Sequence, residues 1–401
     1  MTTDPNAAPR RNALILAAAM AFNGSAPAIA ISLGGLAGLH LLGPDKSLAT
    51  APVTGYNIGV ALAALPAALY MARVGRRVGF MSGAAVGVLG AFVACFALMQ
   101  HSFWLFAFGL LLSGMGTSFG QQYRFAAADE GTEDFKPKAI SWVLAGGVFA
   151  AILGPQTAIN FRDSMEGVPF AGAFLASAGL VGIAGIILSF LRFQKPKPRA
   201  EQGPYTGRPL MDIMGQPKFV VAVLCAVGSY SLMAFVMTAA PLAMAICGHT
   251  INDSTNGIMF HVIAMFAPSF FTGHLIARFG KMQIIGSGFI ILALCAIVAL
   301  QGISVAHFWI ALVLLGVGWN FGFIGATALL TESYRPEEKS RAQGANDLIL
   351  FSCVAFASLM SGQVLNSVGW DVLNWIVFPI VMVCLLSLLW LDLTTKRQTV
   401  S

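Results

Sequence analysis

Two pairs of residues with soft or borderline donor atoms occur in neighbouring apolar stretches of the chain. Met233 and Met237 are four residues apart, and His261 and Met265 have the same spacing. Residues at positions i and i+4 share one face of a helix, so each pair presents two side chains in one direction. Thioethers and a neutral imidazole favour Cu(I) over Mg(II), Ca(II) or Mn(II). The four side chains therefore predict a copper site between two helices.

The two pairs also lie at matching depths. Met237 and His261 are each ten residues from the ends of their stretches, at positions 247 and 251, which is about 15 Å of helix. Met233 and Met265 are each fourteen residues in, or about 21 Å. Facing helices would then pair Met237 with His261 and Met233 with Met265. Because methionine also fills irregular cores, simple packing stays open as an alternative.

Two cysteines flank the first methionine pair. Cys247 lies beside His249 at one end of the stretch, and Cys225 is 22 residues away, about 33 Å along a helix. That separation forbids a disulfide between them without unwinding. Both thiols are predicted to bind the metal, Cys247 where it arrives and Cys225 where it leaves. The six cysteines contain no CxxC pair and no zinc-type spacing.

One carboxylate lies inside an apolar stretch. Asp347 is a functional candidate because ionisable groups are costly in a membrane. It could carry a coupling proton, or it could pair with Arg341 or Arg124 as a structural ion pair.

Composition identifies the kind of protein that must position these residues. The chain has 401 residues, of which 57% are hydrophobic and only 10% are charged, against roughly 25% charged in a soluble domain. A soluble enzyme, a nucleic-acid-binding protein and a disordered chain are excluded. Apolar stretches long enough to cross a bilayer of ~30 Å recur throughout. They predict an all-α polytopic membrane protein with about twelve spans: 13–39, 48–72, 78–99, 103–128, 138–161, 168–192, 217–247, 251–277, 282–303, 306–331, 340–366 and 370–393.

The basic residues fall in the loops of one side. Only Lys46 and Arg162 lie in the opposite loops, so the positive-inside rule predicts that both termini are cytoplasmic. A Pro- and Lys-rich segment divides the chain near its middle. The expected organisation is an N-terminal six-helix half (1–193), a cytoplasmic linker (194–217) and a C-terminal six-helix half (218–401).

An internal repeat supports this division. Gly75 in the loop after the second span and Gly280 after the eighth are related by an offset of 205. The fourth and tenth spans share a GxGxxFG stretch, starting at Gly114 and Gly316, with an offset of 202. These stretches lie inside apolar spans without a preceding strand, which favours close helix packing over phosphate binding.

The repeat resembles the major facilitator superfamily, whose substrate path lies between two six-helix halves near mid-membrane. Its loop motif G-x-L-x-D-R-x-G-R-R is matched by Gly273, Arg278 and Gly280 in the second half and by Arg73, Gly75, Arg76 and Arg77 in the first. The motif's Asp is replaced by Ala72 and Ala277, so the latch attributed to that Asp is in doubt.

The paired MxxxM and HxxxM motifs resemble the CcoA-type copper importers of alphaproteobacteria. The resemblance implies metal roles for Met233, Met237, His261 and Met265, and thiol roles for Cys225 and Cys247. Riboflavin importers of the same family share stretches of the first half, namely 44–49 and 123–129. Those stretches identify the family, whereas the Met and His pairs favour copper as the substrate.

The predicted protein is therefore a copper importer of the bacterial cytoplasmic membrane that works by alternating access and is not an enzyme. The resemblance implies that it supplies copper for cbb3-type cytochrome c oxidase. Copper is the transported substrate, and no cofactor is expected. The expected partners are the lipid bilayer and a copper chaperone or copper-exporting ATPase, without nucleic acid. The alternatives are a proton-coupled exporter that uses Asp347, or an importer of riboflavin or another organic substrate stacked on Trp142, Trp319 and Phe321.

Overall fold

A computed structural model describes residues 7–43, 46–129, 132, 135–193 and 207–400. The helices before the linker are α1 (Ala7–Asn23), α2 (Ser25–Leu41), α3 (Ala51–Val74), α4 (Arg76–Met99), α5 (Phe103–Gly120), α6 (Tyr123–Asp129), α7 (Lys136–Phe161) and α8 (Ala171–Leu188). Those after it are α9 (Leu210–Met214), α10 (Pro217–Ile246), α11 (Ile251–Phe266), α12 (Ser269–Phe279), α13 (Lys281–Gln301), α14 (Val305–Leu330), α15 (Lys339–Trp375) and α16 (Val377–Val400). No strand occurs in these residues.

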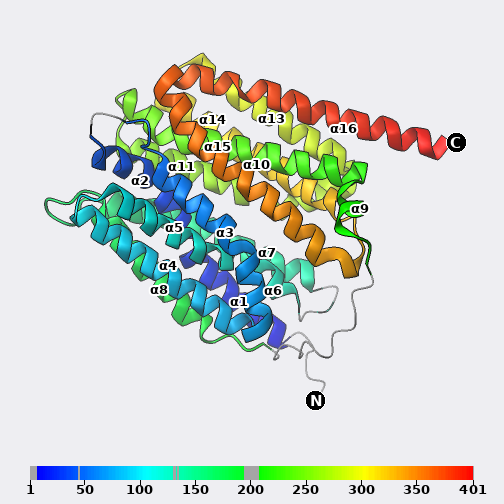
Figure 1. Cartoon of the computed structure of the whole chain (residues 1–401), viewed down its shortest axis with the longest axis horizontal. Helices are drawn as coiled ribbons and strands as arrows, with labels where there is room; N and C mark the ends of the chain where they lie inside the picture. The colour runs from blue at the N-terminus through cyan, green and yellow to red at the C-terminus, as the bar shows by residue number, and fades with distance from the viewer. Residues whose placement is uncertain (1–6, 44–45, 130–131, 133–134, 194–206, 401) are drawn as a thin grey trace.

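The helices account for the predicted number of spans. Within the described residues ten helical segments are long and apolar enough to cross a membrane, or eleven with the pair α11 and α12, which bends by 43°. The last segment, Arg341–Thr394, has 54 residues, or about 81 Å, far more than one bilayer core of ~30 Å. It contains α15 and α16, which run in opposite directions (Figure 1). The prediction of a polytopic bundle of about twelve spans is confirmed.

The two repeats use glycine at equivalent points. Gly75 and Gly280 link α3 to α4 and α12 to α13 with φ of 87° and 93°, a conformation that favours glycine. Gly114 and Gly316 lie at close helix contacts, where an added Cβ would meet the carbonyl oxygen of Tyr56 at 1.9 Å and that of His261 at 2.5 Å. Both GxGxxFG stretches therefore bring helices together, as small residues do in membrane proteins.

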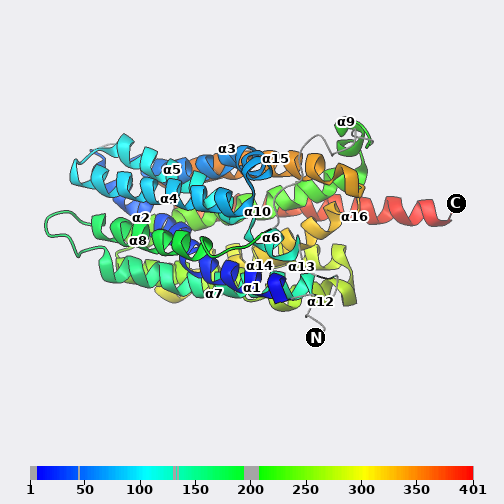
Figure 2. The ribbon, with the colours of Figure 1, turned by 90° about the horizontal axis from the view of Figure 1, so that it is seen from below.

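The most extensive contacts between the two halves involve three helix pairs. The helix α15 packs on α3, α11 on α7, and α10 on α2, and Figure 2 shows α3 and α15 side by side along one face of the bundle. The Ser358 hydroxyl on α15 is the meeting point of a small polar cluster, 3.4 Å from the hydroxyls of both Thr54 on α3 and Thr238 on α10. We call the end with the α3–α4 and α12–α13 loops the basic end.

The predicted linker lies partly outside the described residues, because 194–206 are not described. Its remaining part is tied to the second half at the basic end. Glu338 in the loop before α15 is fully buried and accepts hydrogen bonds from Arg208 N (2.9 Å), Nε (2.8 Å) and Nη2 (2.7 Å). Nearby, Glu332 accepts hydrogen bonds from Lys218 and Lys281 and is 38% exposed.

The buried Glu338 should stabilise the fold more than the exposed Glu332. The Arg208 hydrogen bonds hold the pKa of Glu338 well below its usual 4.5, although desolvation opposes them. Its contribution is therefore complete above about pH 4.5 and lost as the pH falls through the lowered pKa. We expect Glu338→Gln to lower the melting temperature by several degrees near neutral pH, and Glu332→Gln to lower it less. Melting in detergent measures both. An equal effect of the two variants would contradict this account.

Candidate functional site

A cavity of about 1240 Å³ lies between the two halves. Its walls come from α1, α2, α3, α5, α6 and α7 on one side and from α10, α11 and α15 on the other. Pockets that bind organic ligands usually enclose about 300–1,000 Å³ and combine an apolar lining with a few polar groups. The 1240 Å³ includes open solvent at the mouth, and the space that a water-sized sphere's centre can reach is about 160 Å³.

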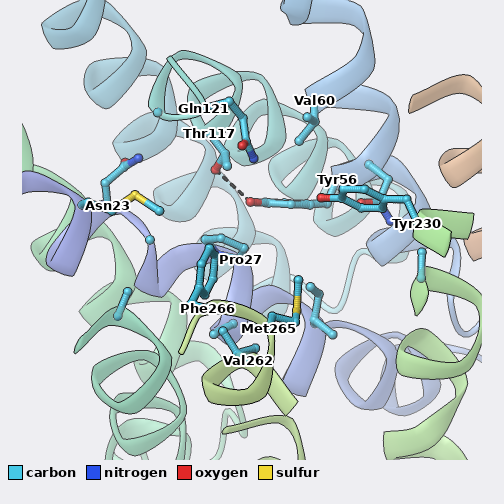
Figure 3. A pocket seen from close by; sticks show the side chains of 18 of the residues that line it. Asn23, Pro27, Tyr56, Val60, Thr117, Gln121, Tyr230, Val262, Met265 and Phe266 are labelled. Carbon is cyan, nitrogen blue, oxygen red and sulfur yellow. Dashed lines mark hydrogen bonds between the residues drawn. The ribbon is translucent and has the colours of Figure 1, made fainter. Parts of the chain in front are cut away.

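The polar lining comes almost entirely from the first half. Its members are Asn23, Asn57, Thr117, Gln121 and Arg124. The Tyr56 hydroxyl donates a hydrogen bond of 2.8 Å to Thr117 Oγ1, which in turn donates to the Ser113 carbonyl. Thr117 and Gln121 face the interior from the same side (Figure 3). This side offers hydrogen-bond donors and acceptors to a ligand.

The opposite side of the cavity is apolar and aromatic. Val262, Met265 and Phe266 project from α11 (Figure 3), and Phe351 comes from α15. Tyr230 on α10 lies edge-on to Phe351, with ring centroids 5.9 Å apart. The cavity therefore has its polar groups mainly on one side, among apolar residues, and aromatic and apolar residues on the other, which suits a flat amphiphilic molecule.

Three of the predicted metal ligands meet at this cavity. Met233 and Met237 on α10 and Met265 on α11 all line it, and each is at least nine-tenths buried. The structure thus brings these three thioethers to one space.

His261 lies elsewhere and does not line the cavity. The side chain is fully buried against α14, and its Nδ1 lies 2.8 Å from the Leu312 carbonyl oxygen. Because a carbonyl only accepts, Nδ1 carries the proton and Nε2 is left as the acceptor. Within the described residues Nε2 has no hydrogen-bond partner. The two-rung arrangement expected from depth stays a prediction, with His261 hydrogen-bonded to α14 and Met265 in the cavity lining.

The two predicted thiols are also outside the cavity. Cys225 is fully buried on the side of α10 that faces α16, where its Sγ is 4.0 Å from Ser387 Oγ. Cys247 ends α10, and desolvation, aided by Asp371, raises the pKa of its thiol, which disfavours the metal-binding thiolate. Among the described residues no three His, Cys, Asp or Glu side chains could share a metal ion. The predicted metal roles of both thiols stay untested.

The aromatic residues expected to stack a ring do not line the cavity. Trp319 is stacked on Phe323 behind Tyr230, Trp142 packs on Phe135, and Phe321 is likewise absent from the lining. The aromatic lining residues are Tyr56, Tyr230, Phe266 and Phe351. They lie on four different helices, so no local motif in the sequence marks them.

The predicted acid Asp347 on α15 is not part of the cavity lining and forms no ion pair within the described residues. It accepts a hydrogen bond of 3.0 Å from Asn346 Nδ2, and it attracts Arg124 electrostatically. No contact within 4 Å joins Asp347 to Arg124 in the described part of the chain. Its role in proton coupling stays a prediction.

A bundle of membrane-spanning helices in two repeats, with a central cavity between them, defines a multi-pass membrane transporter. The model of the Major Facilitator Superfamily matches residues 11–357 and 269–401. The chain belongs to the Major Facilitator Superfamily. The expected transporter fold is therefore confirmed.

Relatives and solved structures agree with this assignment. The chain is 49% identical over 387 residues to the riboflavin transporter RfnT of Brucella anthropi, covering 96% of this chain and 97% of the relative. It is 31% identical to the uncharacterized MFS-type transporter YddS of Bacillus subtilis, covering 92% and 89%. The POT family transporter PepTSo and the nucleoside transporter NupG each superpose with a TM-score of 0.70. At 14% and 12% identity, covering 98% and 94% of this chain and 99% of each structure, they show the fold alone.

These relatives do not support the expected CcoA-type subtype. The first-half stretches shared with riboflavin importers agree with the relative that is 49% identical, whereas the Met and His pairs pointed to copper. The copper, metal-binding and cytochrome-oxidase parts of the prediction therefore receive no support from the comparisons.

Proposed function

We propose that this transporter imports riboflavin or a closely related flavin. The observation that carries the proposal is 49% identity, over nearly the whole length of both chains, to a protein named as a riboflavin transporter. At that level of identity and coverage the two chains are expected to share one fold, so their cavities are expected to be built from the same helices.

The shape of the cavity supports a flavin. Riboflavin has a flat three-ring system with a polar edge and a flexible chain of hydroxyl groups. The aromatic wall of Tyr230, Phe266 and Phe351 would contact the ring system. The polar wall of Asn23, Gln121 and their neighbours would hydrogen-bond the ring edge and the hydroxyl chain.

The cavity methionines have a role in this proposal too. Thioether sulfurs make favourable contacts with aromatic rings and adapt their shape to a ligand. Met233, Met237 and Met265 line the same space as Phe266. They would pack against the flavin ring rather than bind a metal ion.

Location and direction form part of the proposal. The basic end carries the Lys and Arg loops, so the positive-inside rule places it in the cytoplasm of a bacterial cell, with the protein in the cytoplasmic membrane. The flavin would bind from the opposite side and leave toward the basic end after the halves rock about the cavity.

Growth of a riboflavin-requiring bacterium tests the proposal. The host would have neither riboflavin synthesis nor an importer of its own. We expect the wild-type chain to restore growth at limiting riboflavin, and Tyr230→Ala to need much more riboflavin at equal membrane abundance. Failure of the wild-type chain to restore growth, with the protein present in the membrane, would contradict flavin import.

Copper import is the second candidate, and one observation favours it. Three thioethers line one cavity. The His261 side chain also has one ring nitrogen, Nδ1, held by the Leu312 carbonyl, and the other, Nε2, has no hydrogen-bond partner among the described residues. Such an outer hydrogen bond is typical of histidines that bind metals. The copper chaperone or exporting ATPase expected as a partner belongs to this candidate alone.

Replacing methionine by leucine separates the two candidates. Leucine keeps the volume of methionine but has no sulfur donor, so ring packing survives and metal binding does not. We expect Met233→Leu with Met265→Leu to keep riboflavin uptake within about tenfold of wild type, since such a swap costs less than about 1.5 kcal/mol and about 1.4 kcal/mol is a factor of about ten. Uptake of labelled riboflavin measures this, with Met99→Leu, outside the cavity lining, as the matched control. Loss of uptake in the double variant alone would favour a sulfur ligand.

A further inference from the structure

The cavity contains a single charged lining residue among those described, Arg124 on α6. Its Nε is buried and has no hydrogen-bond partner in the described part of the chain. One face of its guanidinium covers the Phe125 ring, 4.8 Å from the ring centroid. The edge of the guanidinium, which carries the N–H donors, therefore remains available to a hydrogen-bond acceptor.

Within the described residues no side chain forms a hydrogen bond or ion pair with this cation. Asp347 on α15 attracts it electrostatically, but no ion pair within 4 Å joins the two in that part of the chain. A guanidinium has five donors in a planar fork and no acceptor. Leaving such donors unpaired in a partly buried site is costly, so the site is suited to a ligand that brings acceptors.

Two other polar residues of the cavity lining add both donors and acceptors. Gln121 and Asn23 line the same wall, and their carboxamides make no side-chain hydrogen bond within the described residues. Figure 3 shows Asn23 and Gln121 away from the apolar group of Val262, Met265 and Phe266. Each carboxamide can accept one N–H and donate its own.

One edge of the flavin ring system has the matching pattern. Its pyrimidine ring presents two carbonyl oxygens on either side of one N–H group. A planar fork of donors can bind a carbonyl acceptor in a fixed orientation, and a carboxamide oxygen can accept the N–H. The hydroxyl chain at the other end of riboflavin has no such need for a cation.

We infer that Arg124 is a specificity-determining residue that binds the carbonyl–NH–carbonyl edge of a flat heterocycle, with Gln121 and Asn23 of the same cavity lining supplying further donors and acceptors. This inference rests on the proposed flavin import and deepens it. It orients the ligand with its pyrimidine edge toward the first half and its apolar rings toward Phe266. Lumiflavin, which keeps this edge and lacks the hydroxyl chain, should therefore remain a ligand.

Ligand analogues test the contact directly. Purified full-length protein in detergent would be titrated with riboflavin, lumiflavin and N3-methylriboflavin, with flavin fluorescence as the readout. For the wild type we expect N3-methylriboflavin to bind at least about tenfold more weakly than riboflavin, because the methyl group blocks the edge. Arg124→Gln should weaken riboflavin binding about tenfold or more. This variant should bind riboflavin and N3-methylriboflavin with similar affinity.

Two further variants keep the test specific. Arg124→Lys retains the charge without the planar fork and should recover only part of the affinity. Arg278→Gln is the matched control, since Arg278 also covers the ring of the next residue, Phe279, at 5.2 Å but is exposed and outside the cavity. It should bind all three flavins like the wild type.

The outcomes separate this inference from the proposed function. A wild type that binds riboflavin, with Arg124→Gln weakening all three flavins equally or none of them, would overturn the inference and leave flavin import standing. A wild type that binds none of the three would overturn both. Loss of lumiflavin binding with retained riboflavin binding would show that the hydroxyl chain, not the ring edge, is recognised, and would also overturn the inference.

Discussion

Gly114→Val is expected to prevent the chain from forming a folded transporter. Gly114 on α5 lies against α3, where an added Cβ would be 1.9 Å from the Tyr56 carbonyl oxygen and 2.8 Å from its carbon. Both atoms belong to the backbone, so the two helices must move apart. The loss of folding stability should exceed that of ordinary overpacking, which is about 1–3 kcal/mol. The shift also displaces Tyr56, which lines the cavity.

The amount of monodisperse protein after detergent extraction measures this effect. Gly179→Val on α8 is the matched control, because nothing lies within 4 Å of an added Cβ there. We expect the control to behave like the wild type and Gly114→Val to aggregate or disappear. A monodisperse Gly114→Val variant with normal yield would show that α3 and α5 are not packed as described.

The second large effect is expected at Gly362, where the halves meet away from the basic end. An added Cβ there would be 2.1 Å from Thr50 Oγ1 and 2.9 Å from Thr50 Cβ. Gly362 belongs to α15 and Thr50 precedes α3, so Gly362→Ala should disfavour closure of this end without disrupting either half. A destabilisation of 1–3 kcal/mol shifts a two-state population about 5- to 150-fold, and riboflavin uptake should fall in that range.

A second substitution, at Thr50, tests whether the contact between Gly362 and Thr50 causes this effect. Thr50 Oγ1 is buried without a partner in the described residues, so removing the side chain costs little hydrogen bonding. Thr50→Gly should restore uptake to Gly362→Ala because it vacates the space that the new methyl group needs. Riboflavin uptake by the single and double variants, measured at matched membrane abundance, tests this recovery. Normal uptake by Gly362→Ala, or no recovery in the double variant, would contradict a closed contact at this point.

The architecture was accessible to sequence reasoning because it depends on local patterns. Apolar runs, one-sided basic loops and the 205-residue offset between Gly75 and Gly280 each follow from bilayer thickness, charge or duplication. The two GxGxxFG stretches were also interpretable, since Gly114 and Gly316 lie at helix contacts.

The binding site was harder to predict for a physical reason. Spacing of four residues establishes that His261 and Met265 share a helix face, but it does not say which neighbour that face meets. In a membrane bundle the neighbouring helices are all apolar, so the hydrophobic pattern does not indicate which of them the face contacts. In the structure Met265 lines the cavity and His261 contacts Leu312 on α14.

The substrate prediction faced the same ambiguity. Methionines in a cavity can bind a soft metal or pack on an aromatic ring, and the sequence motif was interpreted as the former. The residues that favour a flavin, namely Tyr56, Tyr230, Phe266 and Phe351, come from four helices and converge only in the folded protein. Arg124 was identified in the sequence, but its exposure to the cavity was not.

Uptake of labelled riboflavin and labelled copper by the same proteoliposomes tests the central claim most directly. The vesicles would contain the purified wild-type chain, with protein-free vesicles as the control. We predict saturable riboflavin accumulation that excess lumiflavin inhibits, and copper accumulation no greater than in the control. Copper accumulation in the absence of any riboflavin accumulation would contradict flavin import and return the cavity methionines to the role of metal ligands.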